Sequence, residues 1–95
     1  MQFYNRITDQ AVSPLPWQER LKPGDYYVIE NHSIDEVRVY GQILDTRKNC
    51  ESGFFNVRAY SAKYPGGEVG FMCIMEVTRT ISRDEFEAAR REGWT

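Results

Sequence analysis

The 95-residue chain contains little histidine and cysteine, two residue types on which many catalytic and metal sites depend. It contains one histidine, His32, and two cysteines, Cys50 and Cys73. A zinc site needs about four cysteine or histidine ligands, and these three residues do not have the spacing of a zinc motif. His32 lies beside Ser33 in a polar turn, and this pair alone does not indicate nucleophilic catalysis. The sequence therefore predicts a protein that is not an enzyme, with no catalytic residue, metal ligand or cofactor.

An excess of one charge and long apolar runs are also absent. The 12 basic and 14 acidic residues give a net charge of −2, and no basic cluster marks a nucleic-acid surface. No stretch approaches the roughly 20 apolar residues that cross a membrane. The first residues lack the apolar core of a signal peptide. We therefore expect a cytoplasmic protein with no membrane contact, in which Cys50 and Cys73 stay reduced.

The composition that is present is typical of one folded globular domain. Hydrophobic residues make up 41% of the chain and aromatic residues 14%. Residues 1–24 carry apolar side chains at irregular intervals, and we expect an N-terminal arm that packs on the core. Within it, residues 16–21 have the pattern of one helical turn with Trp17 and Leu21 on the same side. Residues 25–95 then form the domain itself.

The stretch from residue 53 to residue 78 predicts a β-hairpin around the turn Pro65-Gly66-Gly67. In the first strand, apolar residues alternate with polar ones, which predicts one buried face. That face consists of Phe55, Val57 and Ala59. The second strand, residues 68–78, alternates as well, and its predicted inward face consists of Val69, Phe71, Cys73, Met75 and Val77. Met72 and Ile74 then lie on its outward face, which has to be covered either by a partner or by the chain's own C-terminal helix and N-terminal arm.

Two earlier segments predict further strands, at residues 25–30 and 36–44. In the second of these, Val39 and Ile43 belong to the apolar face and Tyr40 to the opposite face. Gly41 in mid-strand indicates a bulge or a close backbone approach.

The end of the chain predicts a short helix over residues 83–92. Ser82 and Glu85 have the spacing of a capping box, and Ile81 and Phe86 that of a hydrophobic staple. Gly93 is placed to end the helix in a left-handed conformation, which lets Trp94 fold back on Ala89. The fold class predicted is thus α+β and mostly β: a four-stranded antiparallel meander, curved into a small SH3-like barrel or sheet, with one C-terminal helix.

One sheet face has the side chains that single-stranded nucleic acid requires. Arginine interleaved with tyrosine on a sheet can stack bases and neutralise phosphates. The residues expected on that outward face are Arg38, Tyr40, Arg58 and Tyr60. The same residue types are common in protein interfaces.

Residues 81–94, together with Arg58-Ala59-Tyr60-Ser61 and Pro65-Gly66-Gly67-Glu68, resemble small uncharacterised proteins of bacterial phages, integrative elements and gene cassettes. The resemblance covers roughly the second half of the chain. It implies a small cytoplasmic binding protein carried by a mobile element, and it implies no catalytic residues.

Our leading hypothesis is a non-enzymatic binding module that acts by protein–protein contact, as a homodimer or with another protein. The partner surface expected is the apolar face of the hairpin, with Tyr60, Tyr64, Met72 and Ile74. The alternatives are the single-stranded nucleic-acid binder described above and a small-molecule binder. The aromatic pocket expected for the latter is lined by Tyr26, Tyr27, Phe54 and Phe71.

Overall fold

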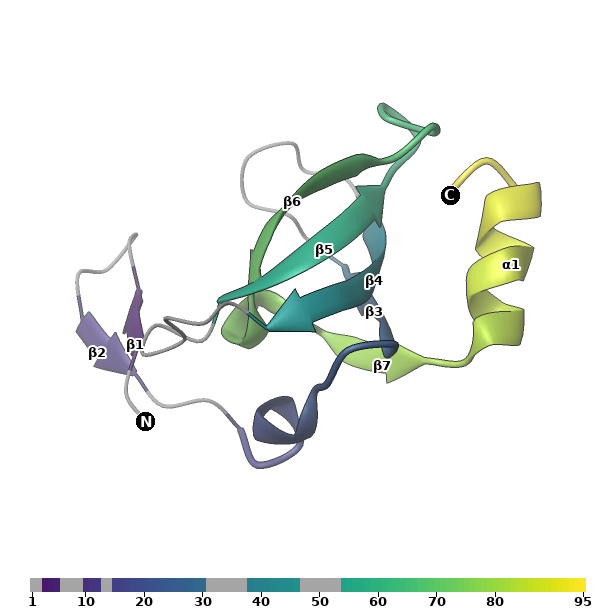
Figure 1. The fold of residues 1–95 in the computed structure, drawn as a ribbon. Coiled ribbons are helices and arrows are strands. Elements are labelled where there is room, and N and C mark those ends of the chain that lie inside the picture. Colours follow the sequence, from purple (N-terminus) through teal and green to yellow (C-terminus); the bar gives the residue numbers. More distant parts are fainter. Residues whose placement is uncertain (1–2, 6–9, 13–14, 31–37, 47–53) are drawn as a thin grey trace.

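The computed structural model describes residues 3–5, 10–12, 15–30, 38–46 and 54–95 (Figure 1). Five antiparallel strands form one sheet in the order β6-β5-β4-β3-β7, and a helix, α1 (Arg83–Arg91), follows the last strand. The strands are β3 (Tyr26–Ile29), β4 (Val39–Thr46), β5 (Phe54–Tyr60), β6 (Glu68–Cys73) and β7 (Arg79–Ile81). The prediction of a mostly-β fold with a C-terminal helix is confirmed. The prediction of four strands is wrong, and the sheet is not closed into a barrel.

The fifth strand arises because the chain turns where one long strand was expected. Strand β6 ends at Cys73, and a 3-10 turn, η3 (Ile74–Glu76), leads into β7, which pairs with β3 at the other edge of the sheet. Residues three apart lie on the same side of a 3-10 turn. Ile74 and Val77, three residues apart, are both buried. Apolar residues therefore continue past Cys73 in the sequence, although strand β6 ends there.

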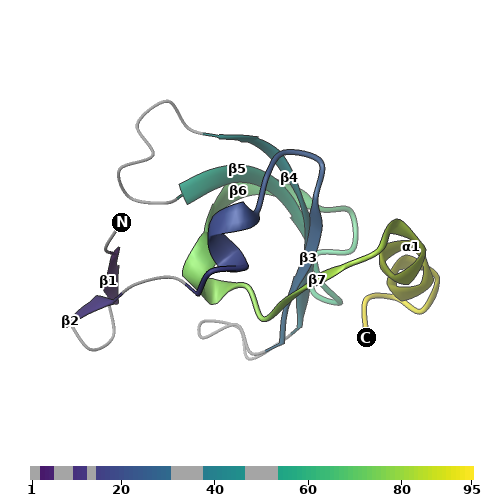
Figure 2. The same ribbon diagram turned by 90° about the horizontal axis from the view of Figure 1, so that it is seen from below.

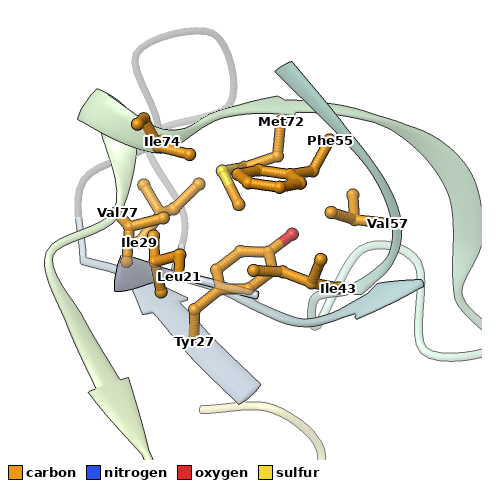
Figure 3. Packing of buried hydrophobic residues seen from close by; sticks show 9 residues of the cluster. All are labelled: Leu21, Tyr27, Ile29, Ile43, Phe55, Val57, Met72, Ile74 and Val77. Atoms are coloured by element: carbon orange, nitrogen blue, oxygen red, sulfur yellow. The ribbon is translucent and has the colours of Figure 1, made fainter. Parts of the chain in front are cut away.

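The sheet curves around an interior cluster of apolar side chains (Figures 2 and 3). Its members are Leu21, Tyr27, Ile29, Ile43, Phe55, Val57, Met72, Ile74 and Val77. The prediction that Phe55, Val57 and Val77 are buried is confirmed, but the faces predicted for Val69, Phe71 and Met72 are reversed. Phe55 lies directly opposite Met72 in the β5–β6 register, and opposite residues share a face of the sheet. Met72 is consequently in the core, and Val69 and Phe71 are outside.

A buried glutamine attaches the preceding segment to the core. Gln18 begins a 3-10 turn, η1 (Gln18–Arg20), and its Nε2 donates to the carbonyl oxygens of Val77 at 3.1 Å and of Met75 at 3.4 Å. Its Oε1 accepts a hydrogen bond from the N–H of Leu15 at 2.8 Å. The helical turn predicted here is therefore present. The strands β1 (Phe3–Asn5) and β2 (Gln10–Val12), which the sequence did not predict, form a separate hairpin at the far end of the molecule from α1 (Figure 1).

Helix α1 lies on the outside of the sheet and covers a second apolar cluster (Figure 2). The buried members of this cluster are Val28, Tyr40, Phe86, Ala89 and Trp94. Both predicted ends of the helix are confirmed. The Ser82 hydroxyl accepts a hydrogen bond from the N–H of Glu85 at 3.1 Å. At the other end Gly93 has φ +76°, its N–H donates to Arg90, and the N–H of Trp94 donates to Ala89 at 2.7 Å.

Replacing the helix cap gives the first prediction. Ser82→Ala removes the side-chain acceptor for the N–H of Glu85 and is expected to lower the free energy of unfolding by about 1 kcal/mol. Ser82→Asp is the matched control, because an aspartate can accept the same hydrogen bond and should stay close to wild type. Both are measured by urea unfolding. An Ala variant as stable as wild type would contradict the role of this cap.

Gly41 gives the second prediction. A Cβ atom at Gly41 would overlap the ring of Tyr27, so the close approach expected at this glycine is present. Gly41→Ala is expected to lower the free energy of unfolding by about 1–3 kcal/mol, because the core must shift to admit a methyl group. Gly70→Ala is the matched control in the same sheet, where the added Cβ would meet nothing within 4 Å. Equal melting temperatures for the two variants would refute the steric explanation.

Candidate functional site

The outer face of the sheet is divided into a part under α1 and a part outside it. Under the helix, the ring of Trp94 stacks on Tyr60, with the centroids 4.6 Å apart and the planes 18° from parallel. The centroids of Trp94 and Tyr40 are 5.6 Å apart, and the Trp94 Nε1–H donates to the carbonyl oxygen of Pro65 at 3.2 Å. The guanidinium of Arg90 lies 5.4 Å from the centroid of Tyr60. The outer tyrosines of β4 and β5 are therefore held in the protein's own aromatic cluster.

This arrangement bears on the four nucleic-acid candidates. Tyr40 and Tyr60 are paired across β4 and β5 and face outward, as expected, but Tyr40 is only 5% exposed and Tyr60 is half-buried. Arg38 is exposed, and its Nε lies 2.9 Å from a carboxylate oxygen of Glu30. Arg58 is exposed on β5 and has no ion pair among the residues that the structure describes. The structure thus keeps the arginines accessible and covers the rings that were expected to stack bases.

On the part of the outer face that α1 does not cover, apolar side chains are exposed. Val69 is 61% exposed and Phe71 57%, and both extend from β6. Leu44 is 44% exposed, at an irregularity of β4 between Ile43 and Asp45. We call Leu44, Val69 and Phe71 the outer apolar strip. Strand β5 lies between β6 and β4, and its outward residues are polar. Arg58 is opposite Val69, and Asn56 is opposite Phe71.

The predicted partner-binding residues do not form one surface. Met72 is 2% exposed and Ile74 6%, so the expectation that they lie on an outward face is wrong. The reason is the cross-strand register, which aligns Met72 with the buried Phe55. Tyr60 is on the opposite side of the sheet, under Trp94, and Tyr64 is 42% exposed in the turn between β5 and β6. The apolar surface of this hairpin is formed instead by the residues that were expected inside.

The predicted aromatic pocket is not assembled either. Tyr26 packs against Phe86 with ring centroids 4.6 Å apart, Tyr27 is in the core, and Phe71 is on the outer face. The side chain of Phe54 lies outside the described part. An open pocket of about 380 Å³ exists elsewhere, between η1, the turn before β3, and β7. Its lining includes Trp17, Arg20, Leu21, Tyr26 and Ile81. Sequence reasoning placed Trp17 and Leu21 on the same side of a turn but did not bring Ile81 to them, because strand β7 was not predicted.

Metal-binding clusters and membrane-spanning helices are absent from the described part of the chain. In that part, no three His, Cys, Asp or Glu side chains are grouped so as to hold a metal ion. The described residues also include no helix that is long and apolar enough to span a membrane. His32 and Cys50 lie outside the described residues, and Cys73 is half-buried.

Comparison with known proteins does not assign the chain to a group. No protein-family model matches it, and neither does a curated protein or a solved structure. The resemblance to small proteins of mobile elements therefore stays a prediction. The function has to be argued from the surfaces described above.

The buried hydroxyl of Tyr27 gives the third prediction. Tyr27 is 1% exposed, and its hydroxyl points into the interior cluster (Figure 3). Burial raises the pKa of Tyr27, and the carboxylate of Glu76 raises it further. An unfolded tyrosine ionises near pH 10, so above that pH the unfolded state loses a proton that the folded state retains. This difference destabilises the folded protein as the pH rises.

Tyr27→Phe removes that contribution. The stability of the variant relative to wild type should increase above about pH 10, by up to about 1.4 kcal/mol per pH unit. Urea unfolding at pH 8, 10 and 11 measures the difference, with Tyr64→Phe as the variant at an exposed tyrosine. A difference between Tyr27→Phe and wild type that does not change with pH would show that the phenol ionises in the folded state as it does in the unfolded chain.

Proposed function

We propose that this protein is a small non-enzymatic binding module that acts by protein–protein contact, as a homodimer joined through the outer apolar strip. The observation that carries the proposal is the exposure of Val69 and Phe71, each more than half accessible, on the same face of β6. Val69 and Phe71 are neighbours on that face, and large exposed apolar patches mark interaction sites. Helix α1 packs on the other part of this face and contributes to a different cluster.

The polarity of the strip suits contact with a second copy. Arg58 is opposite Val69 on the neighbouring strand and shares its face, whereas Glu68 is opposite Ala59 and lies on the other face. In a two-fold contact the same patch meets itself, so apolar residues pack on apolar residues. The interface proposed is therefore complementary in polarity.

Single-stranded nucleic acid is the second candidate function, and it has less support. Binding without sequence preference combines a positive groove with aromatic rings on which bases stack. Tyr40 and Tyr60 pack against Trp94, and the net charge of the chain is −2. Arg58 is the feature that favours this candidate, because it is exposed beside the strip.

We also propose a more specific fold for the domain and an origin for the gene. The five-strand order, with a 3-10 turn between β6 and β7, supports an SH3-like barrel left open between those two strands. The association with a phage, integrative element or gene cassette rests on the resemblance alone, and the genes that flank this one in its genome test it. Cytoplasmic location is proposed on the composition of the chain.

The fourth prediction tests the strip as an interface. Wild type is expected to dimerise in a concentration-dependent way, measured by sedimentation or light scattering. Phe71→Glu should remain folded, because the side chain is more than half exposed, and should be monomeric, because a carboxylate would be buried without a partner in the contact. Leu15→Glu is the matched control: Leu15 is 55% exposed but outside the strip, so this variant should still dimerise.

Two outcomes would overturn the proposal. The first is a wild-type protein that stays monomeric at all accessible concentrations. The second is salt-dependent binding of a single-stranded oligonucleotide that Arg58→Gln weakens and Phe71→Glu leaves unchanged, which would favour the nucleic-acid alternative.

A further inference from the structure

The open pocket beside η1 is large enough to hold a small ligand. Its volume of about 380 Å³ lies within the range of small-molecule pockets, which is roughly 300–1,000 Å³. It is formed by η1 and the turn that follows it, by the start of β3, and by the end of β7. These elements are joined by hydrogen bonds: the Gln18 side chain binds the carbonyl oxygen of Val77 just before β7, and β7 pairs with β3.

Two aromatic rings line the pocket and are held by contacts on their other sides. Trp17 is half-buried and packs against the interior cluster. Tyr26 is half-buried, and its ring packs on Phe86 of α1 with the centroids 4.6 Å apart. Leu21 and Ile81 also line the pocket and add apolar surface to it. Because these rings are already positioned, a flat apolar ligand would order little of the protein on binding.

The charges in the pocket leave one cation without a carboxylate. The Nζ of Lys22 lies 3.0 Å from Oδ1 of Asp25, and the N–H of Lys22 donates to Oδ2 of the same residue at 3.1 Å. These two charges offset each other. Arg20 also lines the pocket, and no carboxylate in the described part of the chain pairs with it. A guanidinium in this setting presents several N–H donors to a carboxylate or a phosphate.

We infer that this pocket binds a small ligand in which a flat apolar ring carries one anionic group. The ring packs against Trp17 and Tyr26, and the anion binds Arg20. This pocket shares no residue with the outer apolar strip, so the proposed ligand binding does not depend on the proposed dimer. A carboxylate and a phosphate can both bind this guanidinium, and a titration with one probe of each kind distinguishes them.

The test is a titration of the ¹⁵N-labelled full chain, followed by NMR, with three small probes. Benzoate and phenyl phosphate are the anionic probes, and benzyl alcohol is the neutral one. Amide shifts are expected at residues 17–26 and 79–81 with the anionic probes. A charge-assisted hydrogen bond is worth about 1.5–3 kcal/mol, so the neutral probe should bind about tenfold or more weakly. The tighter of the two anionic probes identifies the preferred anion.

Two variants separate ligand binding from unspecific contact. Arg20→Gln should reduce the affinity for benzoate and phenyl phosphate to that for benzyl alcohol, while the spectrum stays that of the folded protein because Arg20 is exposed. Arg83→Gln, which removes an exposed arginine from α1, should change neither affinity. The inference is overturned if residues 17–26 do not shift, if the neutral probe binds as well as the anionic ones, or if Arg20→Gln binds both anions like wild type.

Discussion

One constraint decides most of this structure: a single sheet has to bury both of its faces with few residues to cover them. The inner face is covered by the curvature of the sheet, which brings Phe55, Met72 and Val77 together, and by the segment that Gln18 ties to the carbonyl oxygens beside β7. Among the described residues, one helix covers the outer face. Because α1 is only 9 residues long, it protects the side of the face near β3 and leaves the outer part of β6 exposed.

The way in which the helix is held determines which chemistry remains at the surface. Trp94 packs on Tyr40 and Tyr60, and Phe86 packs on Tyr26, so the tyrosines of the outer face serve to attach the helix. Aromatic pairs of this kind contribute about 0.5–1.5 kcal/mol beyond the burial of their area. In the described part of the chain, the apolar strip on β6 and β4 and the pocket beside η1 stay accessible.

Features that depend on neighbours in the chain were predictable. The cap at Ser82, the left-handed end at Gly93 and the contact of Trp94 with Ala89 each involve residues within one or two turns. The hairpin around Pro65-Gly66-Gly67 and the buried face of Phe55 and Val57 follow from turn chemistry and alternation. The close approach at Gly41 was also expected, although its partner, Tyr27, was not identified.

By itself, the sequence thus determined the class of fold, the helix with both of its ends, and the hairpin, because these depend on local hydrogen bonds and on periodicity. Only the tertiary structure decided which face of β6 is inside. Apolar residues occupy both faces of that strand, so alternation cannot distinguish Met72 from Phe71, and the pairing of Met72 with Phe55 across the sheet settles it. The same holds for the pocket: Ile81 lies more than 50 residues after Trp17 and Tyr26 in the chain, and long-range packing brings it to them.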